Sequence, residues 1–138
     1  MQLPSDAGVQ FILCEAAREE KGGKITLLGV YPDRKLLLPP ETKFPVPMQL
    51  AFVFFLLDGE GPFNGTLSVN TPNGEPMLTD AALPNILKTP DSAGTIVIGV
   101  APFPIIGFGR NEVVLALDGQ QYHRYFFAVA APPGTVFS

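Results

Sequence analysis

The stretch that decides the fold is Glu112-Val-Val-Leu-Ala-Leu-Asp118-Gly119-Gln-Gln-Tyr-His-Arg-Tyr-Phe-Phe-Ala-Val129. It predicts two strands joined by a tight turn, because Asp-Gly is a frequent pair in hairpin turns and glycine accepts the positive φ that they need. Apolar residues alternate along each half of the stretch. They are Val113, Leu115 and Leu117 in the first half, and Tyr125, Phe127 and Val129 in the second.

The length of the turn sets the register of this hairpin. A three-residue loop would place both alternating sets on one face, which we expect to be the core face. A two-residue loop would turn one strand over relative to the other. We favour the three-residue loop. In that register His123 shares the face of Tyr125 and Phe127, so we expect it to be a structural histidine.

Residues that favour turns recur throughout the remainder of the chain. Its 138 residues include 14 glycines and 15 prolines, which fall between short apolar segments. We expect roughly seven to nine short strands about 10 to 15 residues apart, a pattern typical of antiparallel β-sandwiches. The prediction is one all-β domain over residues 1–138, of immunoglobulin-like architecture, with at most a short helical turn. Residues 132–138 are expected to form a frayed tail.

The N-terminal third predicts a second hairpin. Residues 9–16 and 25–31 are rich in apolar residues, and the segment between them is charged and contains Gly22-Gly23. Such a segment is typical of a hairpin connection. A helix through residues 15–21 is the alternative, because Glu-Ala-Ala-Arg-Glu-Glu has high helix propensity. The two glycines would limit that helix to two turns, so the hairpin is favoured.

Residues 48–57 form the most apolar stretch of the chain. A sandwich strand is usually apolar on one face and polar on the other, but this stretch is apolar on both faces over its second half. Either another part of the chain or a second subunit must cover its outer face. We expect a homo-oligomer, with a dimer favoured, and place Val53, Phe55 and Leu57 at its interface. The charged content of 16%, against about 25% in typical domains, supports this expectation.

Charge and hydropathy argue against several classes of protein. The formal net charge is −4, and no basic face is evident of the kind that nucleic-acid binding requires. The longest apolar run, residues 50–57, is far shorter than the roughly 18 residues of a membrane span. The N-terminus shows no secretory signal pattern, and the only cysteine, Cys14, can form no intrachain disulfide. We therefore expect a cytoplasmic protein.

Few residues of the sequence suggest chemistry. His123 is the only histidine and Cys14 the only cysteine, so a four-ligand zinc site is not expected. No glycine motif for phosphate and no nucleophile motif is present. We expect no cofactor, no metal and no catalytic residue. An enzyme centred on His123 is a remote alternative, which would need Cys14, a serine or a carboxylate beside the histidine in a cleft.

Loops at the ends of the sandwich suggest another alternative, a small-ligand or carbohydrate-binding module. The candidate loops are residues 33–35 and the Pro/Gly-rich residues 102–109. Tyr31 or Phe103 would supply an aromatic platform, and Arg34 a polar contact. The leading hypothesis is a non-enzymatic protein-interaction module that associates first with itself.

Three segments together resemble a known family. They are Cys14-Glu15 before the charged loop, the sequence Gly-Lys-Ile-Thr-Leu-Leu-Gly-Val-Tyr over residues 23–31, and the Asp118-Gly119 hairpin ending in Phe127-Ala-Val129. The chain resembles an uncharacterised group of small bacterial proteins defined only as a domain of unknown function. The resemblance implies a compact β-sandwich from a bacterium. It implies no activity, substrate or catalytic residue.

Overall fold

Nine strands and one short 3-10 turn make up the fold in a computed structural model that describes residues 2–83 and 85–136. In chain order they are η1 (Asp6–Gly8), β1 (Val9–Glu19), β2 (Ile25–Val30), β3 (Lys35–Leu38), β4 (Val46–Leu56), β5 (Gly65–Asn70), β6 (Pro76–Ala82), β7 (Gly94–Ile105), β8 (Gly109–Leu117) and β9 (Gln120–Ala130). The all-β prediction is confirmed. Of the predicted tail, residues 132–136 carry no strand, and residues 137–138 lie outside the described part.

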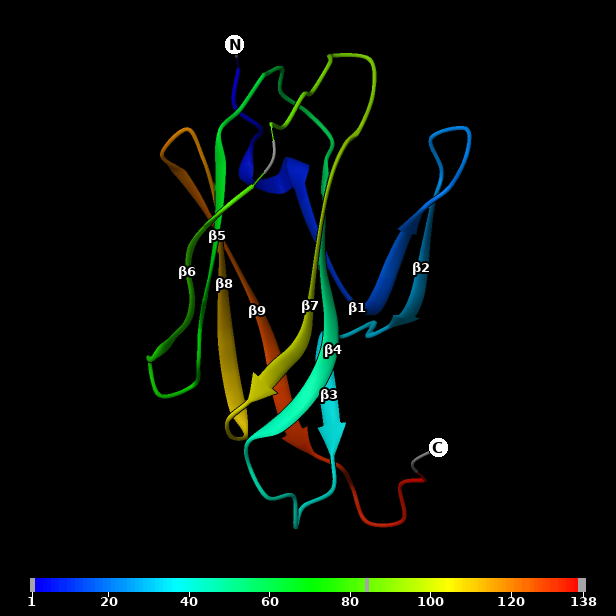
Figure 1. The fold of residues 1–138 in the computed structure, drawn as a ribbon, viewed down its shortest axis with the longest axis vertical. Helices are drawn as coiled ribbons and strands as arrows, with labels where there is room; N and C mark the ends of the chain where they lie inside the picture. Colours follow the sequence, from blue (N-terminus) through cyan, green and yellow to red (C-terminus); the bar gives the residue numbers. More distant parts are fainter. Residues whose placement is uncertain (1, 84, 137–138) are drawn as a thin grey trace.

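The strands form two sheets that pack face to face (Figure 1). The four-stranded sheet has the order β2-β1-β4-β7, and the five-stranded sheet has the order β3-β9-β8-β5-β6. Neighbouring strands are antiparallel, apart from the parallel pair β3–β9. The predicted β-sandwich is therefore confirmed, with one parallel pair at the edge of the larger sheet. No helix in the described part of the chain is long and apolar enough to cross a membrane.

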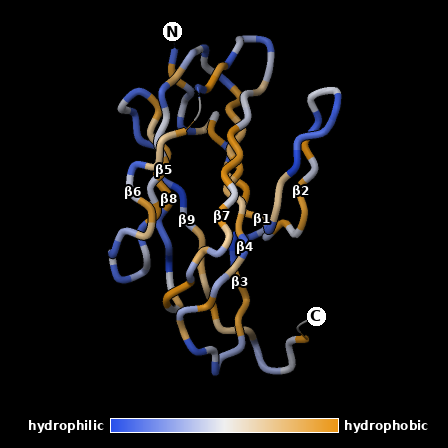
Figure 2. Tube along the Cα trace, viewed as in Figure 1, coloured by the Kyte–Doolittle hydropathy of each residue, from blue (hydrophilic) through white to orange (hydrophobic). Residues whose placement is uncertain are grey.

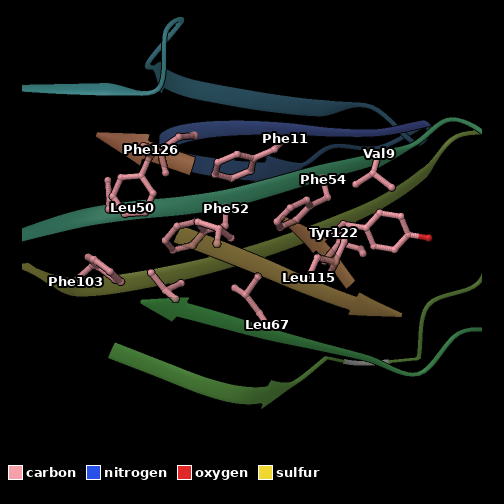
Figure 3. Close-up of a cluster of buried hydrophobic side chains, with 14 of the residues drawn as sticks. Val9, Phe11, Leu50, Phe52, Phe54, Leu67, Phe103, Leu115, Tyr122 and Phe126 are labelled. Atoms are coloured by element: carbon pink, nitrogen blue, oxygen red, sulfur yellow. The ribbon is translucent and has the colours of Figure 1, made fainter. Parts of the chain in front are cut away.

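Phenylalanines from both sheets fill the space between them (Figure 3). The ring of Phe52 lies 5.8 Å from those of Phe103 and Phe126 and 6.2 Å from that of Phe11, measured between centroids. These separations fall in the range of favourable aromatic pairs. The prediction that residues 48–57 are apolar on both faces is confirmed, because the even-numbered residues from Leu50 onward join this core, while Ala51 and Val53 belong to a second cluster on the other face.

The C-terminal hairpin has a two-residue turn, so the three-residue prediction was wrong. Leu117 lies opposite Gln120, and Asp118 and Gly119 both have positive φ, at 46° and 88°. Such turns twist in the same sense as the strands that they join, which favours them in hairpins. The apolar pattern could not reveal this register, because β9 carries aromatic residues on both of its faces.

The shorter turn exchanges the two faces of β9 relative to the prediction. Tyr122, Phe126 and Ala128 point into the core. The residues predicted for the core, Tyr125, Phe127 and Val129, instead lie on the outer face of the five-stranded sheet. His123 lies on the same outer face and is exposed.

The N-terminal hairpin is confirmed, and the alternative helix over residues 15–21 is absent from the structure. Residues 9–14 of β1 pair with β4, whereas residues 14–19 pair with β2. The second half of β1 and β2 therefore form a two-stranded arm, which leaves the sheet beside β4 (Figure 1). The end of the arm is hydrophilic, whereas apolar residues predominate along β4 and β7 (Figure 2).

One predicted loop is a strand. β7 continues through residues 102–105 and β8 begins at Gly109, so the Pro/Gly-rich loop predicted over residues 102–109 was wrong for its first half and is limited to residues 106–108. β7 is the edge strand of the four-stranded sheet. An edge strand tolerates proline because half of its N–H groups have no neighbouring strand to pair with.

Candidate functional site

The outer edge of β7 is the first candidate site. β7 pairs with β4 on one side, and no strand in the described part of the chain pairs with its other side. The pairing with β4 is unbroken from Gly94 to Val100. This part of β7 is therefore a regular strand with one free edge.

The register shows which backbone groups reach that free edge. The N–H of Leu57 donates to the carbonyl of Gly8 at 2.7 Å, so the odd-numbered residues of β4 bond to β1 and the even-numbered ones to β7. The even-numbered residues of β7 lie opposite the even-numbered residues of β4, so their N–H and C=O groups form the hydrogen bonds to β4. The groups that point outward in the regular part of the strand belong to Thr95, Val97 and Gly99, because the register against β4 shifts after Val100.

The other outermost strands carry features that hinder pairing with a further chain. β6 begins at Pro76, contains Asp80 at a φ of 44°, and has two register shifts against β5. β2 contains Gly29 at a φ of 64°, and β3 is only four residues long. Proline, bulges, short length and inserted charges are the usual protection of sheet edges.

β7 lacks such protection between Thr95 and Val100, and its own register shift and prolines begin only after Val100. These residues include no charge, no proline and no positive φ. The inward-facing Ile96 is buried, while Ile98 and Val100 are only partly buried at the margin of the core. A long, regular, apolar edge of this kind is a template for strand pairing.

A second candidate site is a groove of about 670 Å³ on the opposite side of the sandwich. It lies between β1, whose residues 9–13 lack a partner strand on the side away from β4, and β9, which β3 covers only from Phe127 onward. We name it the β1–β9 groove. Its lining residues are Val9, Gln10, Phe11, Ile12, Arg34, His123, Arg124, Tyr125 and Phe127.

Two arginines of this groove differ in how their side chains are used. The guanidinium of Arg124 donates to the carbonyls of Asp6, Val9 and His123 at 2.7 to 2.8 Å, and to the Asp6 carboxylate at 3.0 Å. Its terminal nitrogens are therefore occupied by the protein itself. Arg34 has a φ of 53°, fixed by backbone bonds to Tyr31 and Phe127, and its side chain is exposed. Arg34 is therefore the cation that this groove offers to a ligand.

The residues predicted for a subunit interface lie in different environments. Val53 is fully buried within the single chain, Phe55 is half-buried and Leu57 is 51% exposed. Val53 forms a small second core with Cys14 and Ala51, against which Ala17 and Leu27 of the arm pack. The arm thus covers the outer face of β4 at Val53, so another part of the chain and not a second subunit buries this residue.

The residues predicted for a ligand loop are only partly brought together. Tyr31 and Arg34 belong to one turn, in which the N–H of Arg34 donates to the carbonyl of Tyr31 at 3.0 Å. Burial, followed by the charge of Glu15, raises the pKa of Tyr31. Phe103 is 1% exposed and packs in the core, so its proposed use as a platform was wrong. It faces inward because β7 continues through the predicted loop.

His123 has one charged neighbour. Its Nδ1 lies 3.3 Å from a carboxylate oxygen of Glu112, and both side chains are on the outer face of the five-stranded sheet. Cys14 is buried in the other sheet. Burial raises the pKa of the Cys14 thiol, and an interaction with the backbone of Ala16 opposes that shift. Within the described residues, no group of three or more His, Cys, Asp or Glu residues is arranged to hold a metal ion.

Two features of these sites were not found from the sequence. Residues 94–101 are apolar on both faces and carry no charge, and this absence of charge is the signal that the sequence offers for an unprotected edge. The sequence does not indicate that this strand lies at the edge of a sheet. Nothing in the sequence indicates the role of Arg124, because its contacts to Asp6 and Val9 depend on the two-residue turn.

No protein-family model matches the sequence, and no curated protein is significantly similar to it. The resemblance to a bacterial domain of unknown function therefore stays a prediction. The function has to be argued from the two candidate sites.

Proposed function

We propose that this chain is a non-enzymatic protein-interaction module, and that its binding site is the outer edge of β7. The single observation that supports the proposal is the contrast between edges. β7 presents residues 95–100 without charge, proline or irregular register, and its own register shift and prolines follow only from residue 101, whereas β6, β2 and β3 each carry a protective feature. The proposal assigns no reaction, cofactor or metal to the chain.

The binding mode would be the addition of a strand to the four-stranded sheet. The outward N–H and C=O groups between Thr95 and Gly99 would pair with an extended partner, and neighbouring hollows would receive alternate side chains of that partner. One hollow of about 390 Å³ lies between the arm and β7 and is lined in part by Ala17, Val97 and Gly99. Backbone pairing would supply affinity, and this hollow would select small apolar side chains.

Panning a display library of extended peptides against the purified chain tests the proposal. We expect enriched peptides to be rich in β-branched residues and poor in charge, and to lose binding to a Val97→Lys variant. Thr79→Lys, which places the same charge on an exposed position of β6, is the matched control and should bind normally. Enriched peptides that bind Val97→Lys as well as the unmodified chain would contradict the proposal, as would a library that yields none.

A second candidate function is the binding of a small ligand in the β1–β9 groove. The observation in its favour is that exposed Arg34 shares this groove with the aromatic residues Tyr125 and Phe127. A polar contact beside aromatic surface is typical of small-ligand sites. Thermal-shift measurements with simple sugars and small carboxylates would test it. Stabilisation that is equal in an Arg34→Ala variant would contradict it.

The expected cellular setting is the cytoplasm of a bacterium. The one cysteine of the chain is a buried free thiol, a common state of cysteine in reducing compartments. Fractionation of cells that express the chain with its own termini would test the location. Recovery outside the cytoplasm would contradict it without affecting the assignment of the β7 edge.

A further inference from the structure

We infer that the β1–β9 groove binds a small aromatic carboxylate, with the guanidinium of Arg34 on its carboxylate and the ring of Phe127 against its ring. The inference rests on the second candidate function, because it uses the same groove, and it is independent of the β7 edge. It adds the chemical class of the ligand. The charge of the groove, the free guanidinium of Arg34 and the free ring of Phe127 support it.

The charge of the groove differs from that of the whole chain. The chain has a formal net charge of −4, yet the described residues that line the groove include two arginines and one histidine and no Asp or Glu. Four other hollows of the surface, of about 250 to 560 Å³, each have at least one glutamate in their lining, namely Glu112, Glu15 or Glu19. Among these hollows, the β1–β9 groove is therefore the one that best suits an anion.

Arg34 carries the unbalanced positive charge of the groove. Arg124 pairs with the carboxylate of Asp6 at 3.0 Å, and Nδ1 of His123 lies 3.3 Å from a carboxylate oxygen of Glu112. The guanidinium of Arg34 forms no ion pair with any carboxylate of the described residues. A free guanidinium is a planar fork of donors, which matches a carboxylate through two parallel N–H···O bonds.

The backbone places Arg34 beside Phe127. The N–H of Arg34 donates to the carbonyl of Tyr31 at 3.0 Å, and the carbonyl of Arg34 accepts from the N–H of Phe127 at 2.8 Å. Odd-numbered residues of β9 thus turn their backbone groups away from β8 and toward the groove. The N–H of Tyr125 points the same way, and no carbonyl of the described residues accepts from it. It offers the carboxylate a donor in addition to the guanidinium.

The ring of Phe127 is available for stacking. Phe127 is half-buried, and no other ring or cation in the described part of the chain stacks on it. Tyr125 differs, because Cζ of Arg110 lies 4.5 Å from its ring centroid. Since Phe127 is hydrogen-bonded to Arg34, its ring and the guanidinium can contact two ends of one small molecule. A flat apolar body with a carboxylate at one end matches this pair.

Other ligand classes match the pair less well. A neutral sugar would leave the guanidinium of Arg34 without a counter-charge. Inorganic phosphate would leave the ring of Phe127 without an apolar partner. An aromatic carboxylate uses both groups, so it gains from the charge-assisted hydrogen bonds and from stacking together.

Titration of the isotope-labelled chain with benzoate, followed by nuclear magnetic resonance, tests the inference. Benzamide is the neutral analogue of the same shape, acetate lacks the ring, and inorganic phosphate is an anion without an apolar part. We expect benzoate to bind with a millimolar or lower dissociation constant, and each of the other three probes to bind at least about tenfold more weakly. The largest shifts should occur at the N–H groups of Tyr125 and Phe127. Salt should weaken the binding, because Arg34 is exposed.

Three variants separate contact from general electrostatics. Arg34→Gln removes the charge and should raise the dissociation constant for benzoate by about tenfold or more. Phe127→Leu removes the ring and should raise it by about two- to tenfold. Lys35→Gln is the matched control, because it removes the same charge from the neighbouring exposed residue, which does not line the groove. It should stay within about twofold of the unmodified chain. Circular dichroism would establish that each variant is folded.

Several results would overturn the inference. It is wrong if benzoate does not bind at tens of millimolar, or if benzamide or phosphate binds as tightly as benzoate. It is also wrong if the folded Arg34→Gln variant binds benzoate normally. Equal losses in Arg34→Gln and Lys35→Gln would contradict it as well, because they would show a general attraction to positive charge and not a contact with Arg34.

The outcomes separate this inference from both proposed functions. Simple sugars that stabilise the chain through Arg34, without any binding of benzoate, would overturn the aromatic carboxylate and leave the second candidate function standing. Display peptides that bind Val97→Lys normally would overturn the binding site at the β7 edge and leave the ligand of the groove unaffected.

Discussion

The guanidinium of Arg124 on β9 donates to the carbonyl of Val9 on β1 at 2.8 Å. The bond joins the part of β1 that β2 leaves unpaired to the part of β9 that β3 leaves unpaired, on the side of the sandwich away from β7. The same side chain also binds the carbonyl of Asp6, so it fixes the short turn that leads into β1. One open side of the sandwich is thus closed by a side chain from within. On the β7 side, residues 85–87 lie beside Thr95 and Val97 around a hollow, and no strand in the described part of the chain pairs with that edge.

Arg124→Lys is expected to destabilise the fold. A lysine has three rotatable donors in place of a planar fork, so it cannot reach the carbonyls of Asp6, Val9 and His123 together. We expect the free energy of unfolding to fall by about 1 to 3 kcal/mol, as measured by urea denaturation. Arg110→Lys is the control, because Arg110 is exposed and stacks on Tyr125, and its loss should stay below about 1 kcal/mol. Equal losses in the two variants would show that the hydrogen bonds of Arg124 contribute little to the free energy of unfolding.

The sequence was sufficient to predict the sandwich but not the pairing across its open sides. Asp118-Gly119, the charged loop of the first hairpin and the alternation through residues 48–57 are local signals, and each appears in the structure. The parallel pair β3–β9 joins residues that are more than 90 positions apart. No local pattern specifies such a pair, because its stability comes from tertiary packing and not from the segments themselves.

The packing of Val53 gives a second test. Val53→Ala removes two methyl groups from a fully buried site between Cys14, Ala51 and the arm. We expect a loss of about 1.5 to 3 kcal/mol from lost burial and the remaining cavity. Because the site lies inside one chain, the loss should not depend on protein concentration.

Leu57→Ala is the matched control for Val53, since Leu57 follows the same strand and is half exposed. Its effect should lie within about 0.5 kcal/mol. A loss at Val53 that appears only at concentrations where the chain associates would restore the interface role that the sequence suggested for this residue.

The candidate sites were only partly predictable, for a physical reason. A sequence shows that residues 94–101 are apolar on both faces, but a central strand and an unprotected edge strand look alike in that respect. Whether β7 is a central strand or an edge strand depends on whether β6 or another segment pairs with it. In the structure β6 pairs with β5 instead. Arg34 was found because it lies in a polar turn, whereas the groove beside it is formed by β1 and β9, far apart in the sequence.

The turn of the last hairpin gives a third test. Gly119 has a φ of 88° with open space around it, so Gly119→Ala would meet no steric neighbour and would be strained only by its backbone. Such strain costs about 1 to 2 kcal/mol in a non-glycine residue. Gly107→Ala is the control, because it also has open space but no positive φ; its effect should be within about 0.5 kcal/mol. Equal effects on thermal unfolding would argue against the two-residue turn.

Alkaline stability depends on Tyr122. Its hydroxyl donates to the carbonyl of Pro4 at 2.6 Å inside the fold. Burial, followed by the charges of Asp58 and Asp6, raises the pKa of Tyr122. Tyrosine in an unfolded chain has a pKa of about 10. Below that pH both states are protonated and the contribution of Tyr122 is fully present. Above it the unfolded state ionises first, so this contribution is lost as the pH rises through the folded pKa.

Tyr122→Phe should therefore be less stable than the unmodified chain at pH 7, by about 1 to 3 kcal/mol, because the buried carbonyl of Pro4 loses its donor. The difference between the two should shrink above pH 10, by up to about 1.4 kcal/mol per pH unit between the two pKa values. Urea denaturation at a series of pH values measures it. Val53→Ala is the control, since it changes no titrating group and its difference should stay constant. A Tyr122→Phe difference that is equally constant would mean that Tyr122 titrates alike in the folded and unfolded chain.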